Sequence, residues 1–128
     1  MKVPPTLLLV EDVNEHRQLV RLAVEKIFDC AVLEARDGVE GALLAVEHCP
    51  DLIITDLDMP RMGGIELTAF VRRCPITAAI PIVVLTLRDE ARDGVDLSPF
   101  GILRYLRKPF RPEQLREALS AGGWTPRG

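Results

Sequence analysis

Short apolar runs alternate with segments of helical periodicity along the whole chain, and this alternation restricts the fold more than any other feature. The apolar runs occupy residues 6–10, 30–35, 52–56, 81–86 and 102–106. Segments with apolar residues three and four positions apart occupy residues 14–28, 38–48, 65–73 and 112–121. Strands that alternate with helices connect through right-handed crossovers, so the pattern predicts an α/β fold whose parallel sheet is covered on both faces.

Length and composition bound the class of protein. The 128 residues fit one domain, and the net charge of −3 gives no general attraction to nucleic acid or to an anionic membrane surface. The longest apolar stretch, residues 80–87, is too short to cross a bilayer, and the N-terminus lacks the plan of a signal peptide. Three cysteines without paired spacing indicate reduced thiols that serve in packing, and a cytoplasmic protein.

Several local features give further expectations. Asn14 is expected to cap the first helix, and Gly63-Gly64 to let the backbone turn before the third. The segment 88–100 contains Gly94 and Ser98-Pro99, which predicts a short or irregular fourth helix. Trp124 follows two glycines, and we expect it either in a disordered end or against a partner. The helix 38–48 is expected to bury a stripe formed by Val39, Ala42, Leu43 and Val46.

Chemistry-bearing residues follow four of the predicted strands at the carboxyl edge of the sheet, where ligands bind in open α/β folds. They are Glu11, Asp12, Asp56, Thr86 and Lys108. Three carboxylates gathered together repel each other unless a cation joins them, and an all-oxygen set in a shallow site favours Mg²⁺. A central carboxylate beside a cation, a metal and a hydroxyl can act as a nucleophile that forms an acyl phosphate.

Four blocks carry a resemblance that covers residues from about 6 to 121. They are Leu8-Leu-Val-Glu-Asp12, Asp56-Leu-Asp-Met-Pro-Arg-Met-Gly-Gly64, Val84-Leu-Thr86 and Lys108-Pro-Phe110. In these blocks and their spacing the chain resembles a receiver domain of the bacterial two-component response regulator family. The resemblance implies a single receiver domain over residues 1–128, with a short C-terminal tail and a flavodoxin-like (βα)5 three-layer sandwich of strand order 2-1-3-4-5.

The same resemblance assigns roles to individual residues. Asp56 is expected to accept a phosphoryl group from a sensor histidine kinase or phosphotransfer protein, and Lys108 to pair with that group. Mg²⁺ is expected on Glu11, Asp12, Asp56 and the backbone carbonyl of Asp58. Thr86 and Tyr105 resemble the switch pair of the family, and the Lys108-Pro109 bond is expected to be cis. The chain would then be a signalling switch that catalyses only its own phosphorylation and dephosphorylation, rather than an enzyme.

The resemblance also implies partners, and the sequence departs from the family pattern in one place. An output protein or a second copy is expected on the face formed by helix 4, strand 5 and helix 5, with no direct binding of nucleic acid or membrane. Leu87 stands where the family usually has a small residue. Together with a pair between Asp58 and Arg88 across the mouth of the site, its bulk leads us to expect slow spontaneous dephosphorylation.

Three other functions are alternatives to this one. A degenerate receiver would use the same fold for docking or dimerisation without phosphorylation. A phosphatase of the haloacid dehalogenase type shares the Asp56-Leu-Asp58 motif, but usually carries it on the first strand. A nucleotide-binding α/β protein would need a glycine-rich loop after the first strand, and residues 11–14 lack one. The output remains open between a stand-alone regulator, a phosphate relay and part of a longer protein.

Overall fold

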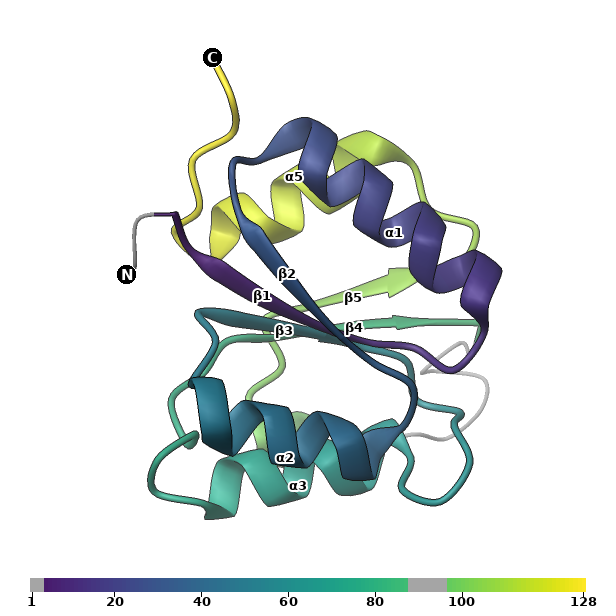
Figure 1. The fold of residues 1–128 in the computed structure, drawn as a ribbon, viewed down its shortest axis with the longest axis vertical. Coiled ribbons are helices and arrows are strands. Elements are labelled where there is room, and N and C mark those ends of the chain that lie inside the picture. The colour runs from purple at the N-terminus through teal and green to yellow at the C-terminus, as the bar shows by residue number, and fades with distance from the viewer. Residues whose placement is uncertain (1–3, 88–96) are drawn as a thin grey trace.

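A computed structural model, which describes residues 4–87 and 97–128, contains a five-stranded parallel sheet between two layers of helices (Figure 1). The strand order is β2-β1-β3-β4-β5, as the resemblance predicted. Helices α1 and α5 cover one face, and α2 and α3 cover the other. The bounds are β1 Thr6–Val10, α1 Asn14–Ile27, β2 Ala31–Ala35, α2 Gly38–His48, β3 Leu52–Thr55, α3 Gly64–Arg73, β4 Ile82–Thr86, the 3-10 helix η1 Ser98–Phe100, β5 Arg104–Arg107 and α5 Pro112–Ala121.

The central strands are apolar on both sides because both faces of the sheet are covered. Every residue of β3 and β4 is buried. Successive side chains of a strand point to opposite faces, so β1 sends Leu7 and Leu9 into the core under α1 and α5, and Leu8 and Val10 into the core over α2 and α3. The alternation therefore builds two cores on one sheet, and this sheet fixes where the strand ends lie.

The C-terminal tail packs on the domain, contrary to the expectation of a disordered or partner-bound end. Trp124 is 3% exposed and meets the ring of Phe28 edge-on, with 5.9 Å between the ring centroids. The backbone N–H of Arg127 donates to the carbonyl of Ile27 at 2.7 Å. Burial of the large indole against the end of α1 is favourable enough to order the residues that follow the two glycines.

The predicted apolar stripe of α2 is wrong in part. Leu43 is 60% exposed and Val39 is 39% exposed, whereas the small residues Gly38, Gly41, Ala42 and Ala45 face inward. A Cβ on Gly41 would lie 3.0 Å from the Val10 side chain. The helix lies so close to the sheet that only small residues fit, and periodicity of apolar residues alone does not reveal this requirement.

Two boundaries and the exposure of one cysteine differ from the sequence expectations. Val13, not Asn14, occupies the N-cap of α1, and the Asn14 side chain instead accepts a hydrogen bond from Arg17 at 2.6 Å. The last strand begins at Arg104 rather than at residue 102. Cys49 is exposed at the end of α2, so packing does not explain that cysteine, whereas Cys30 and Cys74 are half-buried.

The expected fourth helix falls largely on residues 88–96, which lie outside the described residues, as do Gly94 and Arg88. From residue 97 onward the chain forms the short η1. The guanidinium of Arg72 donates to the carbonyls of Phe100 at 2.6 Å and Ile80 at 2.7 Å, which fixes η1 against the end of α3. Within residues 4–87 and 97–128, no helix combines the length and the apolar character needed to span a membrane.

Candidate functional site

The register of the sheet brings the carboxyl ends of β1, β3 and β5 to one edge. Val10 on β1 pairs with Thr55 on β3, so Glu11 and Asp56 follow at the same level. Backbone hydrogen bonds continue one step beyond the strands: Asp56 N donates to Val10 O at 3.1 Å, and Lys108 N donates to Thr86 O at 2.8 Å. The site residues are therefore held by the sheet itself rather than by free loops.

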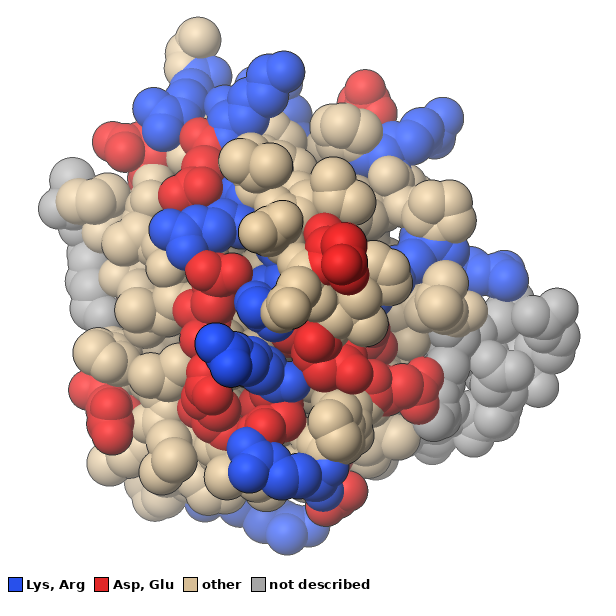
Figure 2. Space-filling view, turned by 45° about the vertical axis from the view of Figure 1, so that its right-hand side comes forward, with Lys and Arg blue, Asp and Glu red and all other residues tan. Residues whose placement is uncertain are grey.

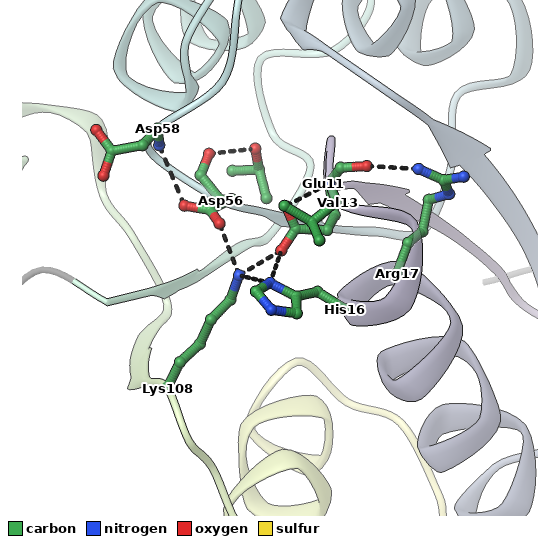
Figure 3. Close-up of polar contacts among 8 residues, drawn as sticks. Glu11, Val13, His16, Arg17, Asp56, Asp58 and Lys108 are labelled. Atoms are coloured by element: carbon green, nitrogen blue, oxygen red, sulfur yellow. Dashed lines mark hydrogen bonds and ion pairs between the residues drawn. The ribbon is translucent and has the colours of Figure 1, made fainter.

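Lys108 joins two carboxylates across this edge (Figure 3). Its ammonium donates to Asp56 Oδ2 at 2.7 Å and to Glu11 Oε1. The three side chains are 10%, 11% and 3% exposed for Lys108, Asp56 and Glu11. A buried charge is tolerated only with hydrogen-bonded partners of opposite sign, so this trio forms one electrostatic unit.

Burial and ion pairing shift the pKa values of Glu11 and Lys108 in opposite directions. Burial raises the pKa of Glu11, and the nearby charge of Asp56 adds to that effect, although the hydrogen bond from Lys108 opposes it. Burial alone would lower the pKa of Lys108, but the hydrogen bonds to Asp56 and Glu11 outweigh it and leave the pKa above its ordinary value. The lysine is therefore held as a cation, which is the form that neutralises the acids around it.

Glu11, Asp12 and Asp56 each offer a carboxylate oxygen, and these oxygens all lie within 4.8 Å of one another. Oxygens on one Mg²⁺ lie about 3 to 4 Å apart, because each sits roughly 2.1 Å from the ion in octahedral geometry. The separation observed here is close to that range and needs only small side-chain movements. The donor set and its spacing therefore fit a small divalent cation.

The loop after β3 lies tightly against the backbone of Asp56. Asp58 N donates to Asp56 Oδ1 at 3.1 Å, and Gly64 N donates to Leu57 O at 3.0 Å. A Cβ on Gly64 would lie 2.0 Å from the carbonyl oxygen of Asp56. Gly64 is thus required by close approach, and the positive φ in this turn is carried by Arg61 (φ 66°) instead of either glycine.

Thr86 and Tyr105 lie near this edge on β4 and β5. Thr86 is the last residue of β4 and is buried, and its carbonyl accepts the backbone hydrogen bond from Lys108. Tyr105 stands opposite Val84 in the register and is 37% exposed. The Lys108-Pro109 bond is cis, as the resemblance predicted.

A small cavity of about 140 Å³ opens beside Asp56. Leu87 belongs to its wall and is 64% exposed, and its expected effect on the lifetime of the phosphoryl group stays a prediction. The Asp58–Arg88 pair falls on residue 88 and lies outside the described residues. The described lining consists of Asp12, Val13, His16, Asp56, Asp58, Leu87 and Lys108.

His16 also lies at this edge, although the sequence analysis assigned it no role. The ring Nδ1 lies 3.1 Å from Lys108 Nζ and 3.5 Å from Glu11 Oε1, with the side chain 41% exposed. The one signal in the sequence is that His16 follows the acidic pair Glu11-Asp12 closely and lies in the first turn of α1.

Comparison with known proteins places this chain in a family. The model of the response regulator receiver domain matches residues 7–120, and the chain belongs to that family. It is 33% identical over 120 residues to the phosphate regulon transcriptional regulatory protein PhoB of Pseudomonas aeruginosa, which covers 93% of this chain and 52% of PhoB. The chain thus spans about half the length of that relative.

Other relatives match along most of their length. A chemotaxis protein CheY homolog of Campylobacter jejuni is 32% identical over 114 residues, which is 88% of both chains. The solved structure of CheY4, a chemotaxis protein of Vibrio cholerae, superposes with a TM-score of 0.82 at 31% identity, over 91% of this chain and 96% of that one. The fold prediction is confirmed, and so is membership in a family of signalling switches.

Proposed function

We propose that this domain takes a phosphoryl group onto Asp56 in a Mg²⁺-dependent reaction and passes the signal to a partner by changing conformation. The observation that carries the proposal is the position of Lys108 Nζ, 2.7 Å from Asp56 Oδ2, beside three acids whose oxygens lie within 4.8 Å. A cation next to a central carboxylate and an oxygen-rich cluster is suited to a phosphoryl group, whose charge lies on its outer oxygens.

In the proposed phosphoryl transfer, the carboxylate of Asp56 is the nucleophile. One of them attacks the phosphorus of a phosphohistidine, the phosphorus–nitrogen bond breaks, and its electron pair stays on the imidazole nitrogen. Lys108 already donates to Oδ2 and can follow the incoming phosphoryl oxygens, while Asp58 N donates to Oδ1 and holds the carboxylate plane. Glu11, Asp12, Asp56 and the carbonyl of Asp58 would hold Mg²⁺, which when bound supplies positive charge to the phosphoryl oxygens.

The conformational response is assigned to Thr86 and Tyr105. The Thr86 hydroxyl would move to bond a phosphoryl oxygen, and the exposed ring of Tyr105 would swing into the space released. Phosphorylation then biases two states that already exist, and only contacts that differ between those states can shift their populations. The burial of Thr86 and the 37% exposure of Tyr105 support the starting state of this scheme.

The proposal implies two kinds of partner. A sensor histidine kinase or phosphotransfer protein would donate the phosphoryl group in the cytoplasm. A second copy or an output protein would bind the face of β5 and α5, where Arg104 on β5 pairs with Glu117 on α5. On the face that Figure 2 shows, acidic and basic side chains are interspersed, so that face has no continuous basic patch of the kind that binds nucleic acid or an anionic membrane.

A degenerate receiver, folded alike but not phosphorylated, remains the second candidate because Leu87 lines the mouth of the cavity. The two functions make opposite predictions for incubation with acetyl phosphate and MgCl₂, followed by mass spectrometry of the intact protein. We expect the wild type to gain one phosphoryl group, Asp56→Asn to gain none, and the matched control Asp58→Asn to retain uptake. Absence of uptake in all three proteins would favour the docking module.

A further inference from the structure

His16 touches the lysine of the proposed phosphoryl site, although the roles assigned so far do not use it. It lies one turn into α1, and its ring stands directly beside the end of Lys108 (Figure 3). The ring also forms part of the wall of the 140 Å³ cavity together with Asp56. Its position therefore indicates that the imidazole of His16 interacts with the ammonium of Lys108.

The hydrogen-bond donors of the Lys108 ammonium indicate what the imidazole does. A lysine ammonium has three N–H groups and no acceptor. Lys108 gives one to Asp56 Oδ2 and one to Glu11 Oε1, and the third faces His16 Nδ1 at 3.1 Å. Because the Lys108 side chain is only 10% exposed, water reaches it poorly and the third donor needs an acceptor from the protein.

An ammonium can only donate, so the 3.1 Å contact is a hydrogen bond when Nδ1 offers its lone pair. This acceptor role requires the tautomer of His16 that carries its proton on Nε2. The Glu11 oxygen at 3.5 Å from Nδ1 is too distant to compete as the main partner of that nitrogen.

We propose that His16 is a positioning residue that accepts the third ammonium hydrogen bond and keeps Lys108 aligned on Asp56. The inference rests on the proposed function, because alignment is useful only if Lys108 must meet a phosphoryl group there. Three acceptors in three directions fix a flexible four-carbon side chain that would otherwise lose its alignment to rotamer freedom. The neighbouring Arg17 does not replace His16, since its guanidinium binds Glu34 and the Glu11 carbonyl.

Two substitutions separate the acceptor from the shape of the side chain. His16→Asn places an amide oxygen where Nδ1 lies, and His16→Leu fills similar space without an acceptor. In phosphorylation by acetyl phosphate with MgCl₂, we expect His16→Leu to be about five- to tenfold slower than wild type, which corresponds to the loss of one hydrogen bond. His16→Asn should recover most of the rate. Equal rates for wild type and His16→Leu, or an equally slow His16→Asn, would overturn the proposal.

A measurement that needs no phosphorylation separates this inference from the proposed function. In a double-mutant cycle at pH 8, urea unfolding is compared for wild type, His16→Leu, Lys108→Met and the double variant. We expect the combined change in the folding equilibrium constant to differ from the product of the single changes by about fivefold or more. Additive effects would mean that the two side chains are not coupled. If the wild type takes up no phosphoryl group while the cycle shows coupling, the proposed function fails and the contact stands.

Discussion

At the scale of single residues, Asp37 illustrates how one carboxylate connects the loop after β3 to the helix layer. It caps α2 by accepting from Glu40 N at 2.9 Å, and it accepts from Arg61 Nε at 2.9 Å. The backbone hydrogen bond from Glu40 lowers the pKa of Asp37 most, although burial opposes it, and the Arg61 pair lowers it further. The ionised form is thus the one that the fold prefers.

This preference predicts a pH dependence for Asp37→Asn. A carboxyl whose pKa is lower in the folded than in the unfolded state stabilises the fold above its unfolded pKa of about 4, and the contribution is lost as pH falls through the folded pKa. We expect the wild type to exceed Asp37→Asn by roughly 0.5 to 1 kcal/mol in unfolding free energy at pH 7, since the Arg61 side chain is 66% exposed and its pair is screened. In urea titrations the difference should shrink as pH falls below about 4 and vanish only below the folded pKa of Asp37; a difference that stays constant with pH would contradict this expectation.

Single residues also show where sequence reasoning succeeds and where it stops. Glu11, Asp56 and Lys108 were predicted to meet because parallel strands end at a common edge, and the register makes this outcome nearly independent of side-chain detail. His16 was missed because its position depends on how α1 lies against Lys108, 92 residues further along the chain. The distance between a helix face and a strand end is not encoded in any local pattern.

At the scale of elements, the start of α3 restricts the choice of residue most strongly, because its backbone lies against that of Asp56. Gly64 was expected to provide a flexible turn, but its backbone is part of a regular helix and its constraint is steric. Similarly, α2 was expected to bury large apolar residues, yet Gly41 faces Val10 so closely that a Cβ there would lie 3.0 Å from the valine side chain. Periodicity predicts which element forms, whereas packing distance decides which of its faces is buried and how large the residues there can be.

Gly64→Ala tests this demand directly. The added methyl group would lie 2.0 Å from Asp56 O, so the backbone of the acceptor must move. We expect the unfolding free energy to fall by about 1 to 3 kcal/mol, as for other overpacked sites, and phosphorylation by acetyl phosphate to slow. Gly63→Ala is a milder comparison, because its Cβ would meet Leu57 O at 3.0 Å, which is tight but 1.0 Å farther than the contact at Gly64, and its φ of −77° suits any residue. Similar losses in both variants would show that close approach is not the cause.

At the scale of the whole molecule, the sheet gathers acids that the unfolded chain keeps apart. Glu11 and Asp56 are separated by 45 positions in sequence but meet at one edge of the sheet, and Asp12 joins them within 4.8 Å. Folding therefore concentrates negative charge at the carboxyl edge, and Lys108 offsets only part of it. A cation that binds the folded state but not the unfolded chain must then stabilise the whole domain.

This linkage gives a prediction for MgCl₂. At a concentration ten times the dissociation constant, binding should add about 1.4 kcal/mol to the unfolding free energy, which raises the melting midpoint by roughly 3 to 6 °C in a domain of this size. Asp12→Asn should lose most of this increase. Without Mg²⁺ the same variant should be at least as stable as wild type, because removing one of three neighbouring acids relieves repulsion. NaCl at matched ionic strength controls for screening in both proteins. If Asp12→Asn gained as much from MgCl₂ as the wild type, Asp12 would not be a ligand, and the three-acid cluster would lose its proposed role as the magnesium site.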